Sequence, residues 1–231
     1  MEQCMTDPCV FRLIREGKLV LILAVHVDDM AVAGTGVEVN KLLVTLNKDF
    51  ETNDLGELSF FTGCTITKDT EKGLTSIRQK TFIETLARRF DVTTTSPYPA
   101  SPSANLGARV EGESGGTWPC KEAVGGLMWL VVVSRPDITN AVRAVSRHSN
   151  SPAERHWKAV LQIMRYLLGT KDLSLTFEWG SGLEISVFAD ANYAEKADDR
   201  RSVSGVAVTV GKSSVSWFSS TQKIVTLSTT E

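Results

Sequence analysis

The pattern of apolar and polar positions in the first part of the chain predicts strands and helices that follow one another closely. Residues 19–27 and 30–33 are β-prone apolar runs on either side of Asp28 and Asp29, so they predict two strands around a tight Asp-Asp turn. Residues 39–50 and 82–90 carry apolar side chains at helical spacing, which predicts two amphipathic helices.

The middle of the chain changes in composition and then becomes helical. Residues 93–116 are rich in Ser, Thr, Pro and Gly, which is typical of a linker. Residues 121–133 are nearly all apolar and predict a buried helix, and residues 135–149 predict a second one. A third helix over 151–169 is expected to open with a capping box between Ser151 and Glu154.

After Gly169 the apolar positions alternate with polar ones. The segments 173–179, 183–191, 203–210 and 214–220 have this period of two and predict an antiparallel meander. Helical segments followed by a separate group of strands favour an α+β fold.

Composition and charge exclude several classes of protein. With 42% hydrophobic and 23% charged residues among 231, the chain resembles an ordinary globular protein. The formal net charge of −2 gives no global basic field, so binding to a polyanion would need a local patch or metal ions. The four cysteines form no CxxC pair and are expected to be free thiols. No signal-peptide or membrane-spanning pattern is found, and the ending LSTTE suggests a truncated helix start.

The two adjacent carboxylates in the apolar hairpin allow two interpretations. A solvated turn is the simpler one. A turn selected for shape alone, however, would favour Asn-Gly or Asp-Gly. Two adjacent like charges cost free energy unless a cation lies between them, and Mg²⁺ prefers such oxygen ligands. A rigid hairpin presenting Asp28 and Asp29 would then suit phosphoryl transfer.

Several segments resemble one family in the family's own order. HVDDMAVAG resembles the YVDD motif on the palm hairpin of reverse transcriptases. The segments DLGELSFFTGCTI, IRQKTFIETLARRF, VGGLMWLVVVSRPDITNAV, HWKAVLQIMRYLLGT and FADANYAEKADDRRSVSG resemble successive parts of the Pol polyprotein of Ty1/copia-type LTR retrotransposons. The resemblance covers about residues 6–231.

The resemblance implies a truncated reverse-transcriptase palm hairpin and thumb, a helical connection and the antiparallel start of an RNase H-like domain. Residues 1–92 would be the end of the palm and the start of the thumb, and 93–116 a linker. Residues 117–170 would form the helical thumb or connection, and 171–231 the N-terminal part of the RNase H-like domain.

The resemblance also assigns acidic residues to two metal sites. Asp28 and Asp29 match the palm aspartates that bind catalytic Mg²⁺, with Mn²⁺ as an alternative, while the family's third aspartate has no counterpart in this sequence. Asp190 and Glu231 match the first two RNase H carboxylates, although each alone could be an ordinary surface charge. His26 replaces the usual Tyr beside the primer terminus, and a tolerated substitution is the alternative.

Nucleic-acid contacts are expected from basic residues on the two mid-chain helices. The residues are Arg143, Arg147, Arg155, Lys158 and Arg165. They could face the phosphates of a hybrid, or they could form an ordinary solvated helical face. The partners implied by the resemblance are an RNA template, a DNA primer and an RNA/DNA hybrid. The implied location is intracellular, in a cytoplasmic virus-like particle or the nucleus, without a membrane.

The function expected from these residues is that of a fragment of an RNA-directed DNA polymerase and ribonuclease H. Because each metal site lacks ligands in this sequence, the isolated chain is expected to be inactive. Two alternatives stay open: a non-catalytic remnant that binds nucleic acid or a partner, and a pseudogene product without function.

Overall fold

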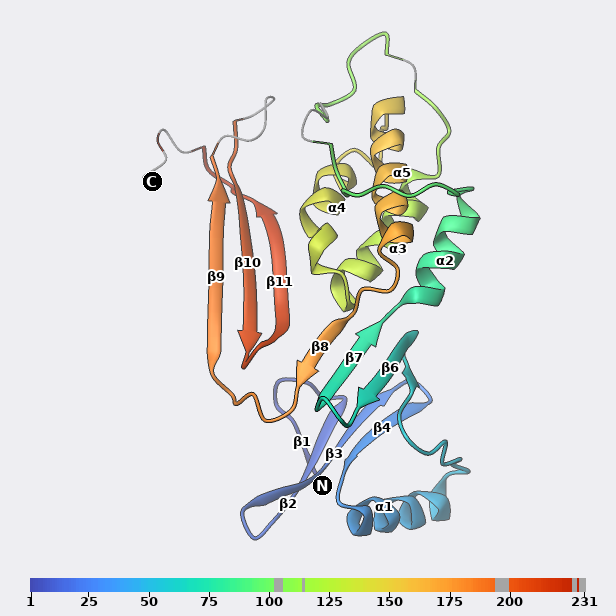
Figure 1. Cartoon of the computed structure of the whole chain (residues 1–231), viewed down its shortest axis with the longest axis vertical. Helices are drawn as coiled ribbons and strands as arrows, with labels where there is room; N and C mark the ends of the chain where they lie inside the picture. The colour runs from blue at the N-terminus through green and yellow to red at the C-terminus, as the bar shows by residue number, and fades with distance from the viewer. Residues whose placement is uncertain (102–105, 114, 194–199, 226–227, 229–231) are drawn as a thin grey trace. The chain divides into compact units, whose positions relative to one another are not determined.

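The computed structural model describes residues 1–101, 106–113, 115–193, 200–225 and 228 (Figure 1). The chain forms two compact units, Met1–Ile66 and Thr67–Glu231. Helices and antiparallel sheets occur together, as the sequence predicted for an α+β fold. This division reflects compactness alone, so the limits assigned from the family resemblance stay predictions.

The first unit is built on a four-stranded antiparallel sheet. Its strands, in order of pairing, are β1 (Glu2–Gln3), β2 (Val10–Arg15), β3 (Lys18–His26) and β4 (Asp29–Gly34). Leu21 and Leu23 are buried while Ile22 between them is exposed, which is the alternation of a strand with one covered face.

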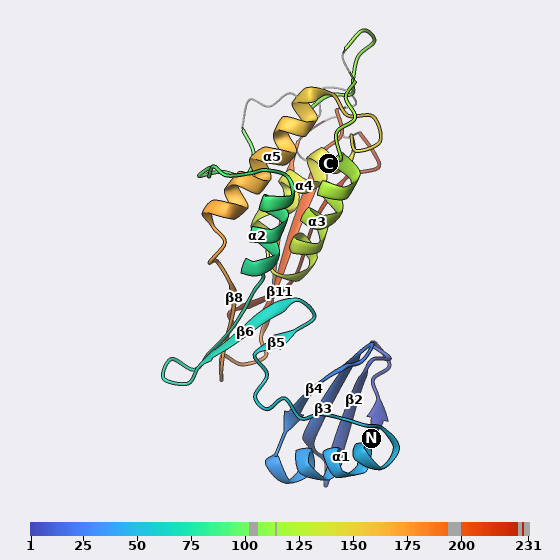
Figure 2. The ribbon, with the colours of Figure 1, turned by 90° about the vertical axis from the view of Figure 1, so that its right-hand side faces the viewer.

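Helix α1 (Gly36–Asp49) follows β4 and packs against β3 and β4 (Figure 2). Leu42, Leu43 and Leu46 are half-buried on one side of it, as the helical spacing predicted. The last residue of β4, Gly34, must lack a side chain, since a Cβ there would lie 2.8 Å from the carbonyl oxygen of Val20 in β3. The close approach of β3 and β4 therefore depends on a missing side chain.

A short hairpin leads out of the first unit. Strand β5 (Phe60–Phe61) pairs antiparallel with the beginning of β6 (Cys64–Asp69), and the limit between the two units falls within β6.

The second unit has a helical core. Its helices are α2 (Lys80–Arg89), α3 (Cys120–Val133), the 3₁₀ turn η1 (Pro136–Ile138), α4 (Thr139–Ser146) and α5 (Glu154–Gly169). Leu127, Leu130 and Ile163 are almost completely buried in one hydrophobic cluster, to which all four α-helices contribute residues. The prediction that α3 is buried holds for one face only, because Met128 and Val132 on its other side are exposed. A helix covered on one side buries only one face, whatever its composition.

Two strand groups complete the second unit. Strands β7 (Leu74–Arg78) and β8 (Leu175–Glu178) pair with each other, and β9 (Ile185–Asn192), β10 (Val203–Val210) and β11 (Ser213–Thr221) form a meander in the order β11-β10-β9. The predicted meander is therefore confirmed for three segments and wrong for β8, which pairs with a strand about 100 residues earlier (Ile77 opposite Leu175).

Strand β11 lies on the helical side of the meander, and β9 lies farthest from the helices (Figure 1). The indole Nε1 of Trp217 donates to the carbonyl oxygen of Val131 in α3 at 2.7 Å. The hydroxyl of Ser219 donates to Asn140 Oδ1 in α4 at 3.3 Å. Side chains on this face of the sheet therefore point toward the helices.

A buried ion pair joins the end of α3 to the end of α5. Arg135 is 2% exposed, and its Nε and Nη2 donate to the carboxylate of Asp137 at 2.9 and 2.7 Å. Its Nη2 and Nη1 also donate to the hydroxyl and carbonyl oxygens of Thr170 at 2.7 and 3.2 Å. Burial alone would raise the pKa of Asp137, but the hydrogen bonds and charge of Arg135 lower it below its ordinary value.

None of the helices within the described residues has the length and the apolar run needed to cross a membrane.

Candidate functional site

The β3–β4 hairpin places its turn one residue earlier than the sequence predicted. Strand β3 ends at His26 and β4 begins at Asp29, and these two residues are directly paired. The turn therefore consists of Val27 and Asp28, so the predicted Asp28–Asp29 turn is wrong. Asp28 lies at the apex of the hairpin, and Asp29 is the first residue of a strand.

Val27 holds the turn in a backbone conformation that costs free energy. The φ of Val27 is +54°, and the φ of Asp28 is not positive. A positive φ at the first turn residue only is the pattern of a type II′ turn. Glycine is the usual residue at this position. A β-branched residue is rarely found there, because the positive φ costs it about 1–3 kcal/mol of conformational strain. Val27 is also 85% exposed, so burial of its side chain does not offset that cost.

The acidic side chains at the hairpin end are exposed to solvent. Because paired residues of antiparallel strands share a face, the side chains of Asp29 and His26 lie on the same side of the sheet. The ring of His26 makes an edge contact with Phe61 of β5, with ring centres 6.4 Å apart. Asp28 and Asp29 thus present two carboxylates next to an imidazole held by an aromatic contact.

The donor types at this hairpin fit a divalent cation, but the number of donors is small. Carboxylate oxygens are the ligands that Mg²⁺ prefers, and one or two of them, together with substrate phosphates, commonly hold the ion. Within the described part of the chain, no three His, Cys, Asp or Glu side chains lie close enough together to hold a metal. Asp28 and Asp29 therefore fit part of a magnesium site.

Asp190 lies on the face of the meander that points toward the helices. It is paired with Gly205 of β10, which in turn is paired with Ser219 of β11, so the three residues share a face. The N–H of Ala191 donates to Asp190 Oδ1 at 2.8 Å. A Cβ on Gly205 would meet no atom within 4 Å, so the surface beside Asp190 is open.

Asp190 also lines a cleft of about 460 Å³ between the sheet and the beginning of α4. The cleft combines aromatic side chains of the sheet, Phe188 and Trp217, with the polar Asp137 and Asn140 of the helical side. Glu231, the second expected carboxylate of this site, lies outside the described residues. The pairing of Asp190 with Glu231 therefore stays a prediction.

Two of the three basic residues of α5 that were assigned to nucleic acid, Arg155 and Arg165, contact the segment 93–116. Arg155 Nη2 donates to the carbonyl oxygens of Gly107 and Ala108 at 3.0 and 2.8 Å, and Nη1 forms an ion pair with Glu113. These contacts give Arg155 a structural role. Arg165 is half-buried on the same helix, and its carbonyl oxygen accepts a hydrogen bond from Ser96.

The remaining basic residues differ in how strongly the fold holds them. Arg143 donates to Asn140 Oδ1 through Nε and Nη2, at 3.0 and 2.8 Å. Lys158 forms an ion pair with Glu154 at 2.7 Å, and its side chain is 70% exposed. Arg147 is exposed at the end of α4. Their binding to nucleic acid stays a prediction, for which Arg147 and Lys158 are the most accessible.

Two polar clusters of the second unit were not predicted from the sequence. One is the ion pair of Arg135 with Asp137, which the spacing R-P-D signals only weakly. The other is a stacked pair of imidazoles, His148 and His156, with ring centres 4.2 Å apart and planes 4° from parallel. His156 is the third residue of α5 after its N-cap Ala153, the position from which a side chain can accept a hydrogen bond from the N-cap backbone, and this position is the signal that could have identified it.

Comparison with known proteins assigns the chain to a family. Residues 6–102 match the family model described as reverse transcriptase (RNA-dependent DNA polymerase). The Pol polyprotein from transposon TNT 1-94 of Nicotiana tabacum is 34% identical over 98% of this chain, and that from transposon RE1 of Arabidopsis thaliana is 31% identical over 98%. The chain spans only 18% and 15% of the length of these two polyproteins.

A shorter relative matches about half of the chain. The secreted RxLR effector protein 161 of Plasmopara viticola is 37% identical over 49% of this chain and 80% of its own length. No solved structure matches the chain significantly. The family match includes the β3–β4 hairpin, and the similarity to the polyproteins extends over nearly all residues. The chain therefore belongs to the family of the retrovirus-related Pol polyproteins of copia-type transposons.

Proposed function

We propose that the chain is part of a retrotransposon RNA-directed DNA polymerase and that Asp28 and Asp29 are two of its metal-binding carboxylates. The observation that carries the proposal is the hairpin itself. It presents Asp28 at its apex and Asp29 beside it, within the residues that match the reverse transcriptase model. A rigid pair of strands is a suitable scaffold for groups that must be held in place during phosphoryl transfer.

Each residue of the hairpin end has a part in this proposal. When bound, Mg²⁺ would supply positive charge to stabilise the transferring phosphate and polarise the attacking oxygen. Asp28 and Asp29 would bind the ion through their exposed oxygens. His26 lies on the same face as Asp29, and its contact with Phe61 fixes the ring where it can meet the sugar or base of a primer end.

The finer division of the chain follows the same relationship. Residues 1–92 would be the end of the palm and the start of the thumb, and 117–170 the thumb or connection. Residues 171–231 would begin an RNase H-like domain, with Asp190 and Glu231 as its metal-binding carboxylates. The antiparallel meander β9–β11 and the open position of Asp190 beside Gly205 support this assignment. RNA, DNA and their hybrid would be the ligands.

Metal binding tests the hairpin directly. Mn²⁺ is paramagnetic, so binding should broaden the amide NMR signals of residues near the turn. The broadening should be lost in Asp28→Asn and weakened in Asp29→Asn. Asp49→Asn is the matched control, because Asp49 is an exposed carboxylate of the same unit at the end of α1. Equal broadening in all three variants would disprove the assignment.

We expect the isolated chain not to extend a primer. The hairpin offers two carboxylates, whereas two-metal phosphoryl transfer needs a ligand set that grips both ions. Primer extension and hybrid cleavage should be measured with Mg²⁺ and with Mn²⁺. Extension that is lost in Asp28→Asn, or cleavage that is lost in Asp190→Asn, would show that this expectation is wrong.

Non-catalytic binding of nucleic acid is a second candidate function. It is favoured by the exposed positions of Arg147 and Lys158 on neighbouring helices, and a formal net charge of −2 makes the binding weak. Binding of an RNA/DNA hybrid without turnover, falling steeply with salt, would support it. A chain that neither binds hybrid nor turns it over would point to a product without a selected function.

A further inference from the structure

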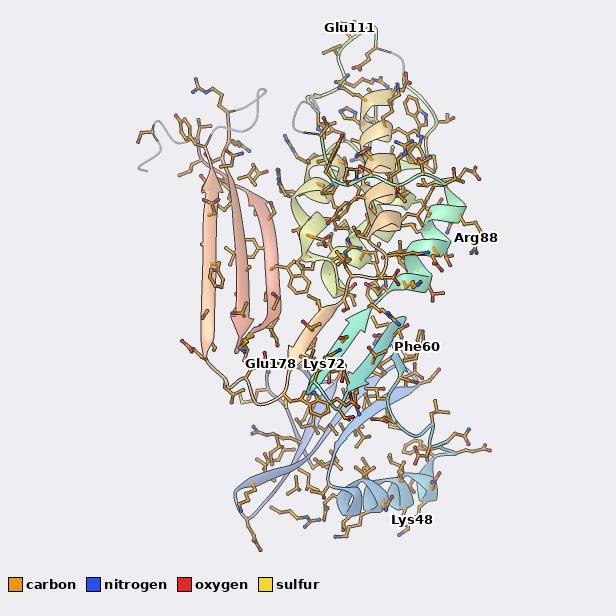
Figure 3. The ribbon with its side chains drawn as sticks, in the orientation of Figure 1. Lys48, Phe60, Lys72, Arg88, Glu111 and Glu178 are labelled. Atoms are coloured by element: carbon orange, nitrogen blue, oxygen red, sulfur yellow. The ribbon has the colours of Figure 1, made fainter. Side chains whose placement is uncertain are left out.

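A stacked pair of histidines lies at the first turn of α5, and one of them, His156, holds a distant segment of the chain. His156 is 1% exposed, and its ring stacks on that of His148 at the end of α4. The segment concerned is residues 106–113, here called the strap. Figure 3 shows Glu111 of the strap above the N-terminal end of α5.

The hydrogen bonds of His156 require a neutral imidazole. The backbone N–H of Ala153 can only donate, and it points to His156 Nδ1 at 2.9 Å. Nδ1 must therefore carry a lone pair. The other nitrogen, Nε2, lies 2.9 Å from the carbonyl oxygen of Gly107, so it must carry the proton. This ring replaces the capping box predicted between Ser151 and Glu154, and it links α5 to the strap.

A second side chain of α5 holds the same strap. Arg155 Nη2 donates to the carbonyl oxygens of Gly107 and Ala108, and Nη1 pairs with Glu113. Gly107 therefore accepts hydrogen bonds from both His156 and Arg155. The strap contains no helix or strand, so these side-chain contacts, together with the packing of Leu106 against the helical core, hold it in place.

The charged groups on the elements that carry or contact the histidines are of both signs. They are Glu154, Arg155 and Lys158 on α5, Arg147 beside His148, and Arg109, Glu111 and Glu113 in the strap. Glu154 is paired with Lys158 and Glu113 with Arg155, so these two carboxylates already have cationic partners.

We propose that the stacked His148–His156 pair is a proton-sensitive latch that holds the strap on α5 at neutral pH and releases it when His156 is protonated. A proton on Nδ1 would direct N–H against the N–H of Ala153 and abolish the cap of α5. The new positive charge would be buried, next to Arg155 and stacked on a second imidazole. Each of these effects opposes the attached state.

The direction of the titration agrees with this geometry. Burial, and then the charge of Arg155, lower the pKa of His156 below its ordinary value of 6.5, against the opposing effect of Gly107. A histidine whose pKa is lower in the attached state stabilises that state above pH 6.5. This stabilisation is lost as the pH falls through 6.5 and then through the lower value.

Hydrogen exchange of the whole chain tests the latch. Protection factors of the strap amides and of Ala153 should be compared at about pH 7.5 and about pH 5. They should fall by up to about tenfold per pH unit once His156 titrates, while the amides of α3 keep their protection. His156→Gln retains one donor and one acceptor without titrating, so its strap should stay protected at both pH values. His26→Gln is the matched control for this readout, and its strap should lose protection at low pH as in the wild type.

Three outcomes would overturn the proposal. They are equal strap protection at both pH values in the wild type, an unchanged loss of protection in His156→Gln, and an equal loss in the α3 amides, which would indicate global acid unfolding. A second measurement does not depend on the variant. In NMR titrations of the wild type, the strap amides should shift with the same midpoint as the His156 ring, and different midpoints would disprove the coupling.

Discussion

His26 and Asp29 are paired directly across the two-residue turn of the β3–β4 hairpin, and their side chains lie on the same face of the sheet. Asp29 is therefore fixed by strand pairing, whereas its neighbour Asp28 depends on the conformation of the turn. Changes to the turn should affect Asp28 first and Asp29 much less.

Replacing Val27 by Gly should stabilise the hairpin. Glycine adopts a positive φ without steric cost, and removing the strain of a β-branched residue should gain about 1 kcal/mol. All five tryptophans lie beyond residue 66, so their fluorescence does not report on this unit. Hydrogen exchange of the β3 and β4 amides is the suitable measurement. Val27→Ala removes the β-branch but keeps a Cβ at positive φ, so it should gain less than Val27→Gly. An equal gain in the two variants would contradict a cost of the Cβ at this position.

Replacing Arg135 by Met should strongly destabilise the second unit. The substitution leaves Asp137 and Thr170 without their buried partner, which typically costs about 3–5 kcal/mol. Urea unfolding followed by tryptophan fluorescence measures the loss. Arg88→Met at the exposed end of α2 is the control and should change stability by less than about 0.5 kcal/mol. Similar losses in both variants would contradict the importance of the ion pair.

Asp137 should make the second unit sensitive to acid. Its pKa in the folded chain is below the ordinary 3.8, because the hydrogen bonds and charge of Arg135 outweigh burial. The resulting stabilisation is present above pH 3.8 and is lost as the pH falls through the lower folded value. Unfolding curves between neutral and acidic pH should show a smaller acid loss in Asp137→Asn. An unchanged acid loss would place the sensitive group elsewhere.

Arg147 and Arg155 should behave differently when replaced by Ala. Arg155 holds the strap, so its loss should reduce strap protection in hydrogen exchange. Arg147 is exposed, and if it contacts a phosphate its loss should lower the salt slope of hybrid binding by about 1. Fluorescence anisotropy at several salt concentrations measures that slope. An unchanged slope in Arg147→Ala would remove this residue from the interface.

Patterns in the local sequence correctly predicted elements such as α1. They did not predict features that depend on contacts between residues far apart in the chain. The spacing of Leu42, Leu43 and Leu46 was sufficient for α1. The exact turn was not predictable, because a β-branched residue at Val27 contradicts ordinary turn preferences.

The pairing of β8 with β7 could not be predicted from the sequence pattern either. Its alternation matches that of the meander strands, and only the register of Ile77 with Leu175 separates it from them. The cap of α5 failed for a related reason, since the ring of His156 takes the position assigned to Ser151 and Glu154.

The pairing of β7 with β8 also has an architectural consequence. The helical core begins just after one strand and ends just before the other, so its entry and exit lie about one strand spacing, ~4.8 Å, apart. The helical core is therefore an insertion between two adjacent strands. Loops within it can lengthen or shorten over evolution without moving the strands that follow, and the whole insertion could be placed between another pair of adjacent antiparallel strands.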